Sequence, residues 1–127
     1  MSVKQKHFFV VDDDEMMAAM LSDHLRLNPL YVVTVFNTGE DCIRQLALDP
    51  DVIILDYQLN SVMLDAADGM EIMRQIKKID EDVRIIMLSS QEEYGTALQA
   101  IIKGALEYVV KDTDTFKRID HILEHQG

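Results

Sequence analysis

The chain has 127 residues, 48% hydrophobic and 28% charged, which is typical of one globular domain and excludes a disordered or fibrous protein. No apolar run approaches the ~20 residues that cross a bilayer, and the N-terminus lacks a secretory pattern, so we expect a cytoplasmic protein with no membrane partner. The formal net charge of −11 disfavours direct contact with nucleic acid, and the single cysteine, Cys42, excludes an intramolecular disulfide.

Five short runs rich in β-branched and aromatic residues predict strands. Three of these runs are apolar almost throughout, which is typical of strands buried on both faces of a parallel sheet. In chain order the five runs are His7–Val11, Tyr31–Phe36, Val52–Leu55, Arg84–Leu88 and Glu107–Val110.

Helical spacing of apolar residues between and after these runs predicts five helices, each with one apolar face toward the sheet. Thr38 and Asp68 are suited to cap the second and third helices, and Gly104 is suited to end the fourth. The five faces are Met17, Met20, Leu21 and Leu25; Ile43, Leu46 and Ala47; Ile72, Met73, Ile76 and Ile79; Tyr94, Ala97, Leu98, Ile101 and Ile102; and Phe116, Ile119, Ile122 and Leu123.

The order is therefore strand then helix, repeated five times over a single domain of residues 1–127. Right-handed crossovers then predict an α/β fold, (βα)5 doubly wound, with a five-stranded parallel sheet and helices on both faces. Ligands of such sheets bind outside the carboxyl ends of the strands, which tells us where to look for chemistry.

Polar residues follow four of the predicted strands at that edge: Asp12–Glu15, Asp56, Ser89 and Lys111. Taken singly, each has an ordinary explanation as a helix cap, a turn residue or a solvated lysine. Together they place several carboxylates, a hydroxyl and an ammonium at one edge of the sheet. Crowded carboxylates repel one another unless a cation joins them, and oxygen ligands favour Mg²⁺. One carboxylate could then attack phosphorus and form an acyl phosphate, with metal and lysine neutralising the transferred charge.

The segments FFVVDDDE, VIILDYQ, IIMLSS and EYVVKD, in this order, resemble the receiver domain of two-component response regulators over essentially the whole chain. The resemblance implies a flavodoxin-like fold and a signalling module that is not an enzyme beyond its own phosphoryl transfer and autodephosphorylation. Asp56 would accept a phosphoryl group from a histidine kinase or a histidine phosphotransfer protein. A downstream effector or output domain would respond, and a homodimer through the fourth helix, fifth strand and fifth helix is plausible for the family.

The resemblance also implies roles for individual residues. Ser89 would follow the phosphoryl group, Lys111 would pair with it, and Tyr108 would change rotamer as part of the switch. The implied Mg²⁺ ligands are Asp13, Asp56 and the backbone carbonyl of Gln58, with Asp12 acting through a bound water.

Two departures from the family pattern stand beside the site. Asp112 replaces a proline whose preceding bond is typically cis, so we predict a trans Lys111–Asp112 bond and a loop in which a second carboxylate could compete for the ammonium. The segment 61–67 makes the loop after Asp56 long. It either folds over the site to modulate phosphoryl lifetime or kinase choice, or it is a tolerated surface insertion.

Two other functional interpretations of the sequence compete with that of a phosphoacceptor module. A pseudo-receiver would use the same fold as a docking module without phosphorylation. An enzyme or flavin carrier on this fold would need a phosphate-binding loop after the first strand, where this chain has Asp12–Asp14 instead.

Overall fold

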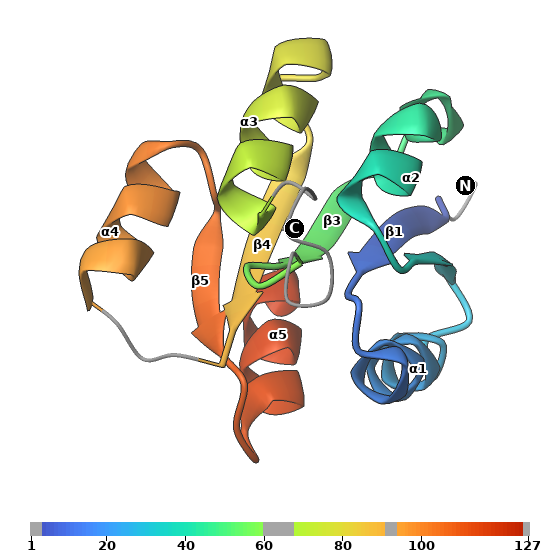
Figure 1. Ribbon diagram of the computed structural model, residues 1–127. Helices are drawn as coiled ribbons and strands as arrows, with labels where there is room; N and C mark the ends of the chain where they lie inside the picture. The colour runs from blue at the N-terminus through green and yellow to red at the C-terminus, as the bar shows by residue number, and fades with distance from the viewer. Residues whose placement is uncertain (1–3, 60–67, 91–93, 126–127) are drawn as a thin grey trace.

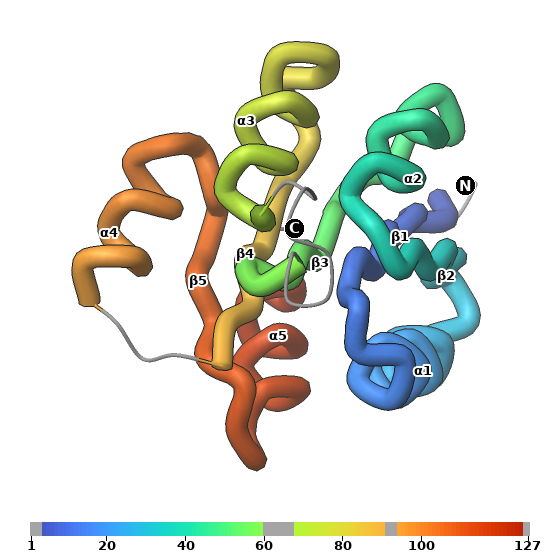
Figure 2. Tube along the Cα trace, in the orientation of Figure 1, coloured from blue at the N-terminus to red at the C-terminus, as the bar shows by residue number. Residues whose placement is uncertain are grey.

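The computed structural model describes residues 4–59, 68–90 and 94–125, and the strand–helix alternation predicted from the sequence is confirmed (Figures 1 and 2). The predictions for the segment 61–67 lie outside the described residues. None of the described helices is long and apolar enough to span a bilayer. The elements are β1 Lys6–Val11, α1 Glu15–Leu25, β2 Tyr31–Phe36, α2 Gly39–Arg44, a 3₁₀ turn Leu46–Leu48, β3 Val52–Asp56, α3 Gly69–Ile79, β4 Arg84–Ser89, α4 Tyr94–Ile102, β5 Glu107–Val110 and α5 Thr115–Glu124.

The five strands form one parallel sheet in the order β2-β1-β3-β4-β5. The order reverses direction between β1 and β3, and this switch point is where doubly wound sheets bind ligands. The register aligns the strand ends, because Val11 lies opposite Leu55 and Ser89 lies opposite Val110. The residues that follow β1, β3 and β5 therefore meet at one edge.

Two hydrophobic layers enclose the sheet, because successive strand residues point to opposite faces. Phe9 and Val11 pack beneath α2, α3 and α4, whereas Phe8 and Val10 pack against α1 and α5 (Figure 1). Cys42 is fully buried in the first layer, and burial raises the pKa of its thiol to about 12. Its thiolate is therefore scarce near neutral pH, in agreement with a structural role.

Several helix faces predicted to be buried are in fact partly exposed. Met20 of α1 and Ile79 of α3 are exposed, while Ala18 and Ser22 take inner positions in α1. The largest departure is α4, in which Ala100 is the buried residue and Tyr94 is 87% exposed. α4 lies near the β5 edge of the sheet and packs mainly on that strand, so little sheet surface is available to cover it. The other large exposed side chains of α4 are Leu98, Ile101 and Ile102.

The second predicted helix is also shorter than its apolar spacing suggested. α2 ends at Arg44, and the Leu46–Leu48 segment forms a separate 3₁₀ turn. Pro50 disfavours a helical conformation at the residue before it, and Asp49 takes a left-handed conformation with φ of 60°. The chain thereby turns into β3 earlier than a continuous helix would allow.

A close backbone approach connects α3 to the strand that ends at Asp56. A Cβ added to Gly69, the first residue of α3, would lie 2.4 Å from the carbonyl oxygen of Asp56 and 2.6 Å from Cα of Tyr57. Only glycine allows the helix to begin this close to the strand end. Gly95 of α4 differs, since a Cβ there would meet nothing within 4 Å.

We expect Gly69→Ala to lower the free energy of unfolding by roughly 1–3 kcal/mol, because the methyl group would push against backbone rather than against a movable side chain. The matched control Gly95→Ala should be neutral or should stabilise the protein by up to about 1 kcal/mol, as alanine does inside a helix. Urea denaturation followed by circular dichroism measures both. Equal effects for the two variants would contradict the close approach.

Candidate functional site

Three carboxylates meet at the carboxyl ends of β1 and β3. Carboxylate oxygens of Asp12, Asp13 and Asp56 lie within 4.8 Å of one another. Asp12 and Asp56 are each 2% exposed, and Asp13 is half-buried. Asp14 has a different role, because its side chain accepts hydrogen bonds from backbone N–H groups in the first turn of α1 and caps that helix. The acidic run of the sequence is thus divided into a cluster and a cap.

Lys111 reaches this cluster from the end of β5. Its Nζ lies 3.1 Å from Oδ2 of Asp12 and 3.2 Å from Oδ1 of Asp56. Its backbone N–H donates to the carbonyl of Ser89 at 2.7 Å, which ties it to β4. The described residues contain no cis peptide bond, so the predicted trans bond between Lys111 and Asp112 is confirmed.

One ammonium cannot neutralise two buried carboxylates. Burial, with the neighbouring charge of Asp12, raises the pKa of Asp56 to about 7, although Lys111 and the backbone N–H of Gln58 oppose this shift. Burial also disfavours the ammonium of Lys111, but Asp56 and Asp12 outweigh it and hold the pKa of Lys111 above its ordinary value. The raised pKa of Asp56 and the raised pKa of Lys111 both reflect an excess of negative charge around one cation.

The donor set fits a hard divalent cation. Oδ2 of Asp12 is buried and accepts no hydrogen bond from any described group, although the ammonium lies nearby. Carboxylate oxygens grouped in this way suit Mg²⁺. The backbone N–H of Gln58 donates to Oδ1 of Asp56 at 3.2 Å, and its side-chain oxygen accepts from the N–H of Ser90 at 3.2 Å. Gln58 is thus at the site, and the role of its backbone carbonyl as a ligand stays a prediction.

The two residues predicted to switch lie on neighbouring strands. Ser89 is fully buried as the last residue of β4. Tyr108 is half-buried in β5, opposite Met87 of β4, and it packs on the hydrophobic layer that includes α4. The structure therefore places both near one another along the β4–β5 pair, and their movement stays a prediction.

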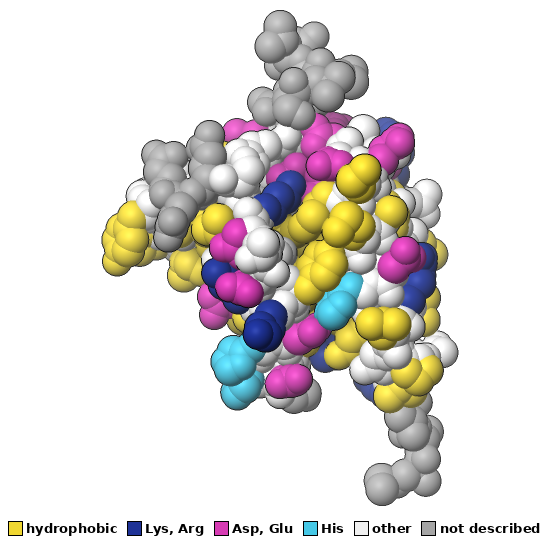
Figure 3. Space-filling model, turned by 90° about the horizontal axis from the view of Figure 1, so that it is seen from below, with side chains coloured by type: hydrophobic (Ala, Val, Ile, Leu, Met, Phe, Trp, Pro, Cys, Tyr) yellow, Lys and Arg dark blue, Asp and Glu magenta, His cyan; other side chains and the backbone are white. Residues whose placement is uncertain are grey.

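The carboxyl edge of the sheet presents charged and apolar side chains next to each other. Figure 3 views this side from below and shows acidic side chains gathered near a basic one, with hydrophobic side chains alongside. Met16, in the first turn of α1 directly after the acidic run, is 73% exposed. The edge is thus acidic at the cluster and apolar beside it.

Sequence reasoning missed two residues that hold the loop after Lys111. Thr115 and Arg118, both in α5, bond to the backbone on either side of Lys111. Arg118 also pairs with Asp112, six residues earlier. No periodic pattern connects residues six apart across a loop and a helix start, so the sequence held no signal for this pair beyond the unusual Asp112.

Residues 8–123 match the Response regulator receiver domain family. The chain is 30% identical over 116 residues to the chemotaxis protein CheY of Bacillus subtilis, a match that covers 91% of this chain and 89% of that one. Among solved structures, the BeF₃-activated receiver domain of DrrB is 30% identical with a TM-score of 0.73, over 94% of this chain and 98% of that one. The receiver domain of NarL from Mycobacterium tuberculosis, at 20% identity and a TM-score of 0.82 over 97% of each chain, shows the shared fold.

Some relatives are much longer than this chain. The protein-glutamate methylesterase/protein-glutamine glutaminase 1 of Carboxydothermus hydrogenoformans is 29% identical over 120 residues, which are 91% of this chain and 34% of that protein. The chain spans about a third of that relative and nine-tenths of the CheY protein. The similarity therefore concerns the receiver-like part of such proteins.

The raised pKa of Asp56 gives a prediction for stability. An acid whose pKa is higher in the folded than in the unfolded state makes its stabilising contribution below the unfolded pKa and loses it as pH rises toward the folded one. Without Mg²⁺, the wild type should therefore lose stability between about pH 4 and pH 7 through Asp56. Asp56→Asn, which cannot ionise, should be more stable than wild type by roughly 1–3 kcal/mol at pH 8 and by much less at pH 5.

Thermal and urea unfolding at several pH values in chelator-treated buffer measure this difference. Asp23→Asn is the matched control, because Asp23 is an exposed carboxylate of α1 and its replacement makes the same charge change. A gain at pH 8 that is equal in the two variants would reflect net charge alone and contradict the prediction.

Proposed function

The chain belongs to the response regulator receiver domain family, and from this premise we propose that it is a phosphoacceptor module in which Asp56 accepts a phosphoryl group from a histidine kinase or a histidine phosphotransfer protein. The observation that carries the proposal is the cluster of buried Asp12 and Asp56 with half-buried Asp13, in which the ammonium of Lys111 lies 3.2 Å from Asp56. A carboxylate nucleophile, a cation site and a fixed positive charge are the parts that phosphoryl transfer requires.

In the proposed reaction an oxygen of Asp56 attacks the phosphorus of a phosphohistidine. The new O–P bond forms as the N–P bond breaks, and the donor imidazole leaves with the bonding electron pair. Mg²⁺, held by Asp13, Asp56 and the backbone carbonyl of Gln58, with Asp12 acting through water, would supply positive charge to the phosphoryl oxygens. Lys111 would exchange its contact with Asp56 for a phosphoryl oxygen.

The phosphoryl group would then change the surface of the protein. It adds about two negative charges and strong acceptor oxygens beside Ser89, whose hydroxyl would turn toward it. Tyr108 would move into the space left behind, and the outer face of α4, β5 and α5 would change shape. The large apolar side chains exposed on α4 support this surface as the one that a downstream effector, an output domain or a second copy would contact.

Incubation of wild-type protein with acetyl phosphate and Mg²⁺ should add the mass of one phosphoryl group, and Asp56→Asn should add none. The gain should be lost when Mg²⁺ is chelated, because the clustered carboxylates would then repel the incoming anion. Intact-mass spectrometry over time measures both.

A phosphorylated histidine-containing protein serves as a second donor where acetyl phosphate fails. Failure of wild type with both donors would refute the phosphoacceptor proposal and favour a pseudo-receiver, which docks its partners without phosphorylation. A gain that persists in Asp56→Asn would place the acceptor on another residue.

A further inference from the structure

The residue that follows Lys111 has a defined set of partners. Asp112 donates its backbone N–H to the hydroxyl of Thr115 at 2.7 Å, a bond that a proline at this position could not form. Its Oδ1 accepts from the N–H of Asp114 at 2.8 Å. Both of its carboxylate oxygens lie 3.0 Å from Nη1 of Arg118. Asp112 is thus fixed both by the loop and by α5.

The same two side chains of α5 also hold the residue before Lys111. The carbonyl of Val110 lies 3.0 Å from the hydroxyl of Thr115 and accepts from Nη1 of Arg118 at 3.3 Å. Thr115 is buried. Because Lys111 itself donates its N–H to the carbonyl of Ser89, its backbone is fixed to β4 while both of its neighbours are fixed to α5.

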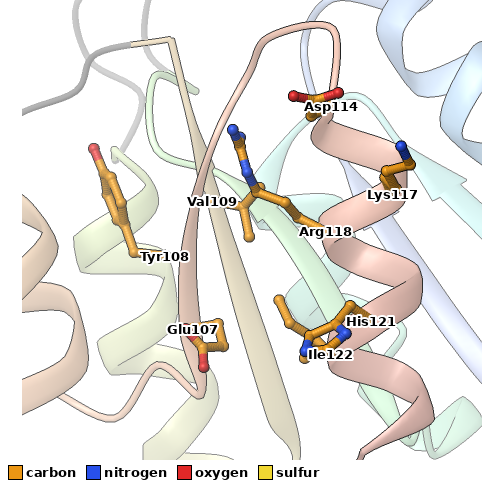
Figure 4. A pocket seen from close by; sticks show the side chains of 8 residues that line it. All are labelled: Glu107, Tyr108, Val109, Asp114, Lys117, Arg118, His121 and Ile122. Carbon is orange, nitrogen blue, oxygen red and sulfur yellow. The ribbon is translucent and has the colours of Figure 1, made fainter.

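Arg118 also pairs with the negative charge on the residue next to Lys111. Its guanidinium extends from α5 toward β5 along a groove of about 550 Å³ between these two elements (Figure 4). The backbone N–H two residues on, together with this guanidinium, holds the pKa of Asp112 below its ordinary value, so Asp112 is a carboxylate at neutral pH. Without the guanidinium, that carboxylate would be an unpaired negative charge on the residue next to Lys111, and it could then compete with Asp56 and Asp12 for the ammonium.

We propose that Arg118 and Asp112 form a positioning pair for Lys111: Arg118 occupies the charge of Asp112, so that the ammonium is directed to Asp56, while Thr115 and the carbonyl of Ser89 hold the loop backbone. This inference rests on the proposed function, since Lys111 matters there as the cation that meets the transferred phosphoryl group. Neither Asp112 nor Arg118 touches the reacting atoms.

A purely structural role for the pair would have different consequences. Side chains of Arg118 and Asp112 are 45% and 42% exposed, and ion pairs as exposed as this contribute little to global stability. A structural role would also make the loss of either partner, or of both, equally harmful. A positioning role predicts an asymmetry, because only the loss of Arg118 leaves an unpaired carboxylate next to Lys111.

The test compares wild type with Arg118→Gln, Asp112→Asn and the double variant. Arg118→Gln should slow phosphorylation by acetyl phosphate at saturating Mg²⁺ by about tenfold, because a ~1 Å misplacement of a catalytic group can cost ~100-fold and the ammonium would be withdrawn only part of the time. The phosphorylation rate of the double variant should be within about threefold of the wild-type rate, since the competing charge is gone. The rate of Arg118→Lys should also be within about threefold of wild type, because lysine keeps the positive charge that pairs with Asp112.

Mg²⁺ affinity, measured by calorimetry without any phosphodonor, distinguishes positioning from structure. Withdrawing the ammonium from Asp12 and Asp56 leaves more negative charge for the metal, so Arg118→Gln should bind Mg²⁺ about two- to threefold more tightly than wild type. Arg44→Gln is the matched control, since it removes an exposed guanidinium that pairs with Asp41 in α2. It should change neither measurement.

Three outcomes would overturn the inference. Arg118→Gln could match wild type in phosphorylation rate and Mg²⁺ affinity, or Arg118→Gln and the double variant could be slowed equally. The third outcome is that Arg118→Gln binds Mg²⁺ more weakly than wild type and is also phosphorylated more slowly. If wild type itself gains no phosphoryl group, the proposed function fails, and the Mg²⁺ titration still decides whether Arg118 keeps the ammonium at the carboxylates.

Discussion

The site depends on an imbalance of charge: two buried carboxylates share one ammonium. Asp12 and Asp56 are almost completely excluded from water, and the Nζ of Lys111 lies 3.1–3.2 Å from both. An unpaired buried carboxylate costs several kcal/mol, so the cluster is stabilised by any further positive charge. A proton on Asp56 and a divalent cation at the three aspartates are alternative ways to supply it, and they compete with each other. The excess negative charge that destabilises the folded protein would therefore also favour the binding of a divalent cation at the three aspartates.

The parallel sheet makes this concentration of charge possible. Its register ends β1, β3, β4 and β5 at one level, and strands buried on both faces hold the end of β3 rigidly in place. The beginning of α3 closes on Asp56 so tightly that only Gly69 fits there. Because the backbone at this strand end is closely packed, a backbone shift is a costly way to relieve the repulsion between the carboxylates, and added cations or side-chain movements relieve it at lower cost.

The sequence was most informative where burial is complete. Strands such as Val52–Asp56 are apolar throughout because both of their faces are covered, and this made the sheet and the meeting of Asp12, Asp56 and Lys111 at one edge predictable. Helical spacing was less informative, because it identifies an apolar face without saying whether the sheet extends far enough to cover it. α4 has such a face and lies at the β5 edge, so Tyr94 stays exposed. The contact between Asp112 and Arg118 crosses a loop and follows no period, so only the fold reveals it.

The segment from Tyr108 to Arg118 physically connects the carboxylate cluster to the outer surface. Tyr108 borders α4, Lys111 reaches the cluster, and Arg118 lies along the groove between β5 and α5. Coupling between two sites requires an element with two arrangements that both sites bias, rather than mere proximity. α4 is the best candidate among the described helices, because Ala100 is its buried residue while its large apolar side chains lie outside the core. An element with so little buried surface costs little free energy to displace. α4 is therefore the described helix that could be displaced at the lowest cost in free energy.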